Sequence, residues 1–193
     1  MKSITVIRNE HQAMAAMLHA LLSLVRGIRE HRLRPNFELL GAMIYYVDTF
    51  PERLHHPKED QWLFRLLGLR HPPARALIDR LQAEHRLGAS RIRQLEQTLS
   101  RYREGGDTEF PAFAAAVEAF VEFERNHMRS EEMEILPLAR EHLLPEDWAE
   151  IDAAFATNAD PLIGASSQDQ FDDLFSRIVN LAPAPIGVGP ATD

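Results

Sequence analysis

The chain has 193 residues, 45% hydrophobic and 26% charged, a composition typical of one domain that can bury a substantial core. Its formal net charge of −8 disfavours a nucleic-acid partner, because such binding needs a basic surface. The absence of cysteine excludes disulfides, thiolate ligands and cysteine nucleophiles, so nitrogen and oxygen must hold any metal. No apolar run approaches the ~20 residues of a membrane span, and the first residues open an amphipathic helix rather than a secretion signal. We therefore expect a cytoplasmic protein that binds neither nucleic acid nor a membrane.

Helical patterning predicts four long helices with short breaks between them. Short connections make neighbouring helices antiparallel, so the expected fold class is all-α, an up-down-up-down four-helix bundle within residues 1–144. Residues 145–181 are expected to add short helices packed on this bundle, the second over 168–181. Residues 182–193 are rich in Pro, Gly and Ala, which predicts a disordered tail. The four predicted long helices span residues 3–31, 36–67, 72–104 and 108–140.

Four histidines and two glutamates fall at one level of the predicted bundle. Residues at equal distances from a turn face each other in an antiparallel pair, and the histidines match by this measure well within the ~2–4 residues by which helix boundaries read from a sequence are uncertain. Each histidine takes a hydrophobe's place in the buried stripe of its helix, and each glutamate lies four residues after a histidine, on the same face. Burying such groups without partners costs ~1–3 kcal/mol each, which a metal pair would offset. The six residues are His11, His55, Glu59, His85, His127 and Glu131.

The donor set indicates the kind of metal. Neutral imidazole suits iron, zinc or copper, whereas carboxylate suits harder ions, so the mixture favours iron or manganese. Four histidines with two carboxylates that can bridge make a natural dinuclear site.

The motifs around these residues resemble the hemerythrin-like HHE cation-binding domains. The resemblance covers about residues 3–140 and rests on Glu10–His11, HHPKEDQWLF from His55, Glu84–His85, and HMRSEEMEILP from His127. It implies that the same six residues hold two irons, bridged by both carboxylates and by an oxo or hydroxo group.

One departure from the family changes the expected coordination. Oxygen-carrying hemerythrins have a second histidine on helix three, four residues before the first, and this chain has Leu81 there. Two histidines, two carboxylate oxygens and the bridging oxygen would leave each iron five-coordinate. His56 is a further candidate nitrogen, although it points ~100° away from His55 on a regular helix. Pro51 and Pro57 interrupt that helix and predict a kink around His55.

A ferritin-like di-iron bundle is the main structural alternative. That fold uses Glu-x-x-His on two helices and one glutamate on each of the others. Here the two motifs would be Glu52 with His55 and Glu124 with His127, and the single glutamates Glu10 and Glu84. The last two lie one position off the buried stripe, and the break after helix two is too short for the crossover of that fold. Whether Glu124 joins the site stays open.

The expected function is that of a non-haem di-iron protein that binds or senses a small diatomic or peroxide, such as oxygen, nitric oxide or hydrogen peroxide. The alternative is a di-iron redox enzyme, either a peroxidase, a nitric-oxide-related enzyme or a protein of iron delivery or storage. Binding needs only an open iron position, whereas turnover also needs electrons and protons. The sequence leaves open whether the protein is an enzyme.

Overall fold

In the computed structural model every regular element between residues 1 and 156 is a helix, which confirms the all-α prediction. The structure describes residues 1–156, 178, 180–183 and 186–187. The helix expected over 168–181 and the tail expected from residue 182 lie largely outside them. Among the described helices, none has the length and apolar character needed to cross a membrane. The main helices are α1 (Lys2–Arg29), α2 (Phe37–Val47), α3 (His56–Lys58), α4 (Arg65–Arg70), α5 (Arg75–Gly105), α6 (Phe110–Ser130), α7 (Leu136–His142) and α8 (Pro145–Phe155).

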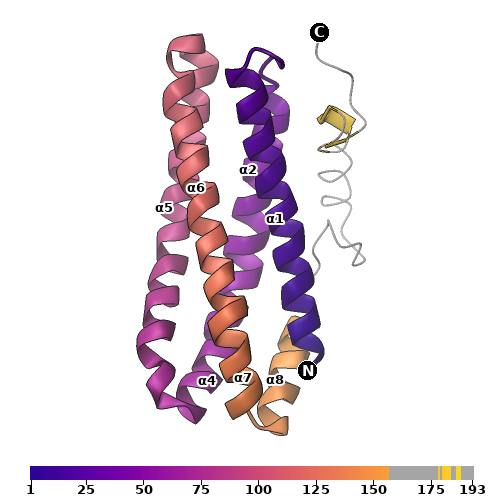
Figure 1. The fold of residues 1–193 in the computed structure, drawn as a ribbon, viewed down its shortest axis with the longest axis vertical. Helices are drawn as coiled ribbons and strands as arrows, with labels where there is room; N and C mark the ends of the chain where they lie inside the picture. Colours follow the sequence, from indigo (N-terminus) through magenta and orange to yellow (C-terminus); the bar gives the residue numbers. More distant parts are fainter. Residues whose placement is uncertain (157–177, 179, 184–185, 188–193) are drawn as a thin grey trace.

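The long helices lie side by side along the longest axis of the molecule (Figure 1). The chain runs upward in α1 and α5 and downward through α2 to α4 and through α6 and α7, as the colours of Figure 1 show. Helix α1 contacts α2 and α6, and α5 also contacts α2 and α6, so each of the four has two neighbours among the others. Residues far apart in the sequence therefore meet along a common interior.

Local sequence explains where the helices begin and end. The side chain of Asn36 accepts a hydrogen bond of 3.0 Å from the backbone N–H of Leu39 and so caps the start of α2. Helix α5 ends at Gly105, and the next residue, Gly106, has a φ of 68°, which glycine adopts without steric cost. These two signals place the turns close to the breaks expected from the sequence.

The second and fourth long segments are not the regular α-helices that the periodicity predicts. They contain three π-helical segments: η1 (Asp48–His55), η2 (Glu59–Phe64) and η5 (Glu131–Ile135). Pro51 lies inside η1, where it lacks the N–H that an α-helical bond would require. π-Helical turns are rare and occur mainly at functional sites. Here each π segment begins or ends at one of the six residues expected to form the metal site.

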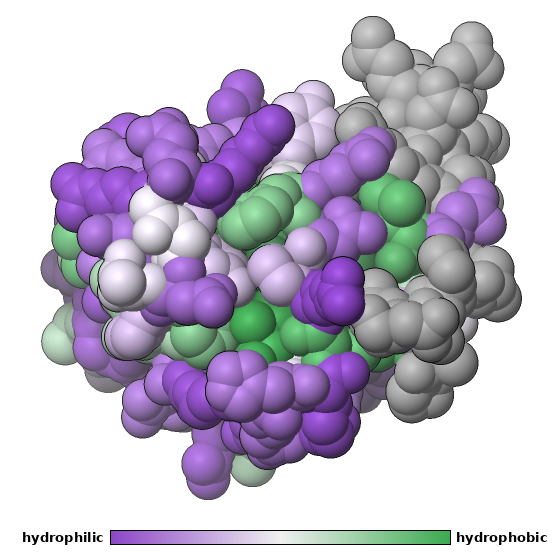
Figure 2. All heavy atoms as spheres, turned by 90° about the horizontal axis from the view of Figure 1, so that it is seen from above, coloured by the Kyte–Doolittle hydropathy of each residue, from purple (hydrophilic) through white to green (hydrophobic). Residues whose placement is uncertain are grey.

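The apolar core is divided into two clusters. Along α1, Ile7 belongs to one cluster and Met14 to the other, and His11 lies between them. The same division falls on α5 between Leu81 and Ile92. Seen from above, hydrophilic residues occupy most of the rim of the molecule and apolar residues show between them (Figure 2). One polar level thus interrupts an otherwise continuous interior.

Helix α8 is fixed to the ends of two other helices by carboxylates. Asp152 accepts hydrogen bonds from the backbone N–H and the hydroxyl of Ser3, at 2.8 and 2.7 Å, and so caps the first turn of α1. Partial burial opposes the charged form of Asp152, but these hydrogen bonds outweigh it and hold its pKa below the ordinary value. Asp147 accepts two bonds from the Arg70 guanidinium, at 2.7 and 2.9 Å, and one from the Leu144 N–H.

We expect Asp152→Ala to lower the free energy of unfolding of the metal-free protein by about 1 kcal/mol at pH 7, because α1 loses its cap. A lowered pKa in the folded state gives stability that is fully present above the unfolded pKa of about 4 and is lost progressively as the pH falls from there through the lower pKa of the folded state. Urea unfolding at pH 7 and at pH 3 should therefore show a smaller difference between the two proteins in acid, without its complete loss. Glu150→Ala is the control, because Glu150 lies on the same helix and its ion pair with Arg65, at 3.4 Å, is exposed to solvent. An equal loss of stability in both variants would contradict the cap.

Candidate metal centre

Four imidazoles converge in two pairs inside the protein. The Nε2 atoms of His11 and His55 lie 3.2 Å apart, and those of His85 and His127 lie 2.9 Å apart. The rings come from α1, the end of η1, α5 and α6, and all four residues are buried. The structure thus brings together the four histidines that the sequence placed at one level.

Glu59 and Glu131 lie between the two histidine pairs. Glu59 directs one oxygen to His55 Nε2 at 3.3 Å and the other to His85 Nε2 at 3.7 Å. Glu131 directs one oxygen to His11 Nε2 at 3.3 Å and the other to His127 Nε2 at 3.1 Å. Each carboxylate therefore offers one oxygen to each pair, which is the arrangement of a carboxylate that bridges two ions.

The oxygens of these two carboxylates are better suited to bind a metal ion than to accept hydrogen bonds from nearby protein groups. Both residues are almost completely buried, and none of their four oxygens has a hydrogen-bond partner among the described residues. A buried carboxylate without hydrogen bonds is costly, because it keeps its charge only beside compensating positive charge. An all-nitrogen and oxygen donor set of this kind suits iron or manganese.

Protons stabilise this cluster when no metal is present. Burial disfavours a charged ring, but the carboxylates of Glu131 and Glu84 outweigh it and raise the pKa of His127 to about 11. The Nε2 atoms of His85 and His127 face each other at hydrogen-bonding distance, so one proton fills the gap between them. A metal ion would take the place of that proton, and metal affinity should therefore rise with pH.

A second set of carboxylates orients the histidines from outside. Each ring donates its Nδ1–H to an acidic side chain at 2.7–3.0 Å, which fixes the tautomer that leaves Nε2 directed inward. The four pairs are His11 with Glu132, His55 with Glu10, His85 with Asp60 and His127 with Glu84.

These contacts follow a twofold pattern in the sequence. Glu10 and Glu84 directly precede the histidines of α1 and α5, whereas Asp60 and Glu132 directly follow the two central glutamates. Glu10 and Glu84 would be metal ligands in the ferritin-like alternative, but the structure places them on the outer nitrogens of His55 and His127. The contacts of Asp60 and Glu132 were not predicted from the sequence, although an acidic residue follows each central glutamate.

Two further glutamates are buried beside the centre. Glu52 lies against the bare Cα of Gly88, where a Cβ would come within 2.2 Å of its carboxylate. Burial and the nearby charge of Glu124 raise the pKa of Glu52 to about 8. Burial likewise raises the pKa of Glu124 to about 7, and neither of its oxygens has a hydrogen-bond partner among the described residues. Both are largely protonated, neutral groups in the folded protein below these pKa values.

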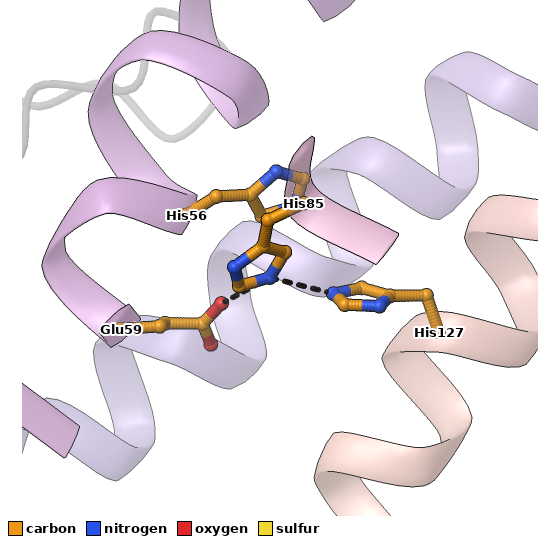
Figure 3. A group of neighbouring side chains, drawn as sticks. All are labelled: His56, Glu59, His85 and His127. Atoms are coloured by element: carbon orange, nitrogen blue, oxygen red, sulfur yellow. Dashed lines mark hydrogen bonds and ion pairs between the residues drawn. The ribbon is translucent and has the colours of Figure 1, made fainter. Parts of the chain in front are cut away.

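His56 is also part of the cluster, which the ~100° separation from His55 had disfavoured. Its ring stacks on that of His85, with centroids 4.2 Å apart and planes 11° apart. His56, Glu59, His85 and His127 each offer one ligand atom, and these atoms all lie within 4.8 Å of one another (Figure 3). A second such group consists of His11, His55 and Glu59.

Comparison with known proteins agrees with this geometry. A family model described as the Hemerythrin HHE cation binding domain matches residues 2–139, which confirms the resemblance seen in the motifs. No curated protein and no solved structure matches the chain.

We expect Glu124→Gln to stabilise the metal-free protein at alkaline pH. The folded state keeps a proton on Glu124 up to about pH 7, whereas the unfolded state releases it near 4.5, so stability falls as the pH rises through this interval. The amide removes that loss, a gain on the order of 1–3 kcal/mol at pH 8 and little at pH 4.

Chemical unfolding of chelator-treated protein at both pH values measures this difference. Glu122→Gln is the matched control, because Glu122 is exposed two positions earlier on α6. A pH-independent effect of Glu124→Gln would show that Glu124 is ionised in the folded protein, and an equal effect of Glu122→Gln would show that burial of Glu124 is not the cause.

Proposed function

Because the chain belongs to the hemerythrin HHE cation-binding family, we propose that its buried cluster holds two iron ions inside a hemerythrin-like up-down four-helix bundle. The observation that carries this proposal is the placement of Glu59 and Glu131, each with one oxygen toward each histidine pair and neither hydrogen-bonded among the described residues. The ligands proposed from the sequence are His11, His55, Glu59, His85, His127 and Glu131.

We propose that this centre binds or senses a small diatomic or peroxide, such as oxygen, nitric oxide or hydrogen peroxide. Bound iron would supply a Lewis-acidic and redox-active centre. The protein supplies an apolar enclosure, since Phe50 and Phe155 lie against the ring of His55 and Phe64 lies against that of His85. Because the metal-binding side chains are buried, only a very small ligand fits the proposal.

The second candidate function is that of a di-iron redox enzyme, including peroxide or nitric oxide reduction and iron delivery or storage. The observation that favours it is the pair of buried carboxyl groups, Glu52 and Glu124, whose pKa values of about 8 and about 7 suit proton transfer near neutral pH.

The remaining proposals concern the setting of the protein. We propose that residues 1–144 form the metal-binding bundle and 145–181 an extension packed on it, of which α8 is the described part. The net charge of −8 supports a protein without a nucleic-acid partner, and we propose a cytoplasmic location.

We predict close to two iron atoms per chain after anaerobic reconstitution with ferrous iron, measured by metal analysis. His11→Ala and His85→Ala should each lose iron, because each removes an imidazole whose Nε2 points into the centre. Glu10→Gln and Glu84→Gln should still reach two irons at saturation, with affinity lowered by about 10–100-fold, because the amide oxygen can still accept the Nδ1–H of His55 or His127.

These four variants also separate the two bundle types. A ferritin-like site would use Glu10 and Glu84 as ligands, so the glutamate variants would lose iron and the histidine variants would keep it. That outcome, or a single zinc ion in the reconstituted wild type, would show that the di-iron assignment is wrong.

A further prediction separates binding from turnover. Anaerobically reduced, iron-loaded protein exposed to oxygen should show a visible absorption change that reverses when oxygen is removed, as expected of a binding protein. Fast oxidation that does not reverse would favour the enzyme instead. Glu124→Gln should leave reversible binding intact, whereas it should slow an irreversible reaction that draws a proton from that carboxyl group.

A further inference from the structure

The twofold pattern of the centre is broken at one position. On α6 the residue after the histidine is Met128, which packs with the apolar core, whereas the residue after His55 is His56. On helix α5, Leu81 stands where oxygen-carrying hemerythrins have an additional histidine, and it too belongs to the apolar core. The chain therefore adds an imidazole to the centre from one helix and lacks one from another.

Geometry places His56 with one histidine pair rather than the other. His55 and His56 are adjacent and point in different directions, so His55 meets His11 while His56 lies against His85 and His127. Its ring centroid is 4.2 Å from that of His85 and 5.3 Å from that of His127. In Figure 3 the ring of His56 lies over that of His85, with Glu59 and His127 beside the same space.

The nitrogens of His56 are buried without a hydrogen-bond partner in the described part of the chain. The residue is only 4% exposed, and neither ring nitrogen has a hydrogen-bond partner there. The nearest acid, Glu52, is 3.7 Å from Nδ1, which is too long for a hydrogen bond. A buried polar atom left unpaired costs about 1–3 kcal/mol. If position 56 only had to stack a ring on His85, phenylalanine would do so without this cost, as Phe64 does on the same histidine.

We propose that His56 is a fifth imidazole ligand, which binds the same metal ion as His85 and His127. This inference rests on the proposed di-iron function and makes the two ions unequal. The ion at His85 has three imidazoles and two carboxylate oxygens, whereas the ion at His11 and His55 has two imidazoles and two carboxylate oxygens. The position for an exogenous ligand is then on the ion held by His11 and His55.

Mössbauer spectroscopy of the diferrous protein, loaded with ⁵⁷Fe, tests this asymmetry. The wild type should show two quadrupole doublets of equal area, and His56→Phe, which keeps an aromatic ring on His85, should bring the two doublets together. Phe64→Leu is the control for stacking, since Phe64 is the other described residue whose ring stacks on that of His85, and this variant should leave two doublets. A single doublet in the wild type, or two unchanged doublets in His56→Phe, would overturn the proposal.

A second measurement needs no variant and covers the case in which His56→Phe does not fold. In the Co²⁺-loaded wild type, each coordinated imidazole contributes one hyperfine-shifted ring N–H that exchanges with solvent protons. Five such signals are expected in the proton NMR spectrum, and four would show that His56 is not a ligand. Absence of all shifted signals would instead contradict the metal site itself, so the two failures are distinguishable.

Discussion

Two buried carboxylates, Glu59 and Glu131, which have no hydrogen-bond partner among the described residues, are the constraint on which the rest of the structure depends. The histidine pairs on either side compensate their charge, through protons in the metal-free state or through bound metal ions. The core must therefore divide into two apolar clusters at this level, and four separate helical segments must each deliver an imidazole to it. The π-helical segments that begin at both glutamates belong to the same requirement, because they occur where the helices turn their side chains into the centre.

The charge around the centre favours cations well beyond the central glutamates. Six carboxylates lie on the four paired histidines or between them: two at the centre and four on the outer nitrogens. Two divalent ions would bring four positive charges against these six negative ones. This excess of negative charge would stabilise higher oxidation states of bound metal ions, since they balance it more completely. Such a centre would suit redox chemistry as well as ligand binding, so it supports both proposed functions.

The level of the site could be predicted from the positions of the turns, and its register from the apolar stripe of each helix. Short turns make neighbouring helices antiparallel, so His11 and His85 could be placed opposite their partners by counting residues from each turn. The orientation of His56 could not be predicted in this way, because a regular helix was assumed for residues 36–67. The outer carboxylates were also missed, since contacts of Asp60 and Glu132 with rings on other helices depend on the rotation of each helix about its axis. Sequence periodicity determines that rotation only to within a fraction of a turn.

Helix α8 lies on the side of the centre formed by His11 and His55, where the position for an exogenous ligand is proposed. The ring of Phe155, at the end of α8, is 6.2 Å from that of His55, and α8 contacts both α1 and η2. The match to the family model ends at residue 139, so α8 lies outside the matched region. Its attachment through Asp152 to the first turn of α1 holds Phe155 beside His55, one of the two histidines proposed to bind the ion with fewer ligands. Access of a small molecule to such an ion would then depend on how firmly α8 is docked, and the Asp152 cap would influence the reactivity of the metal.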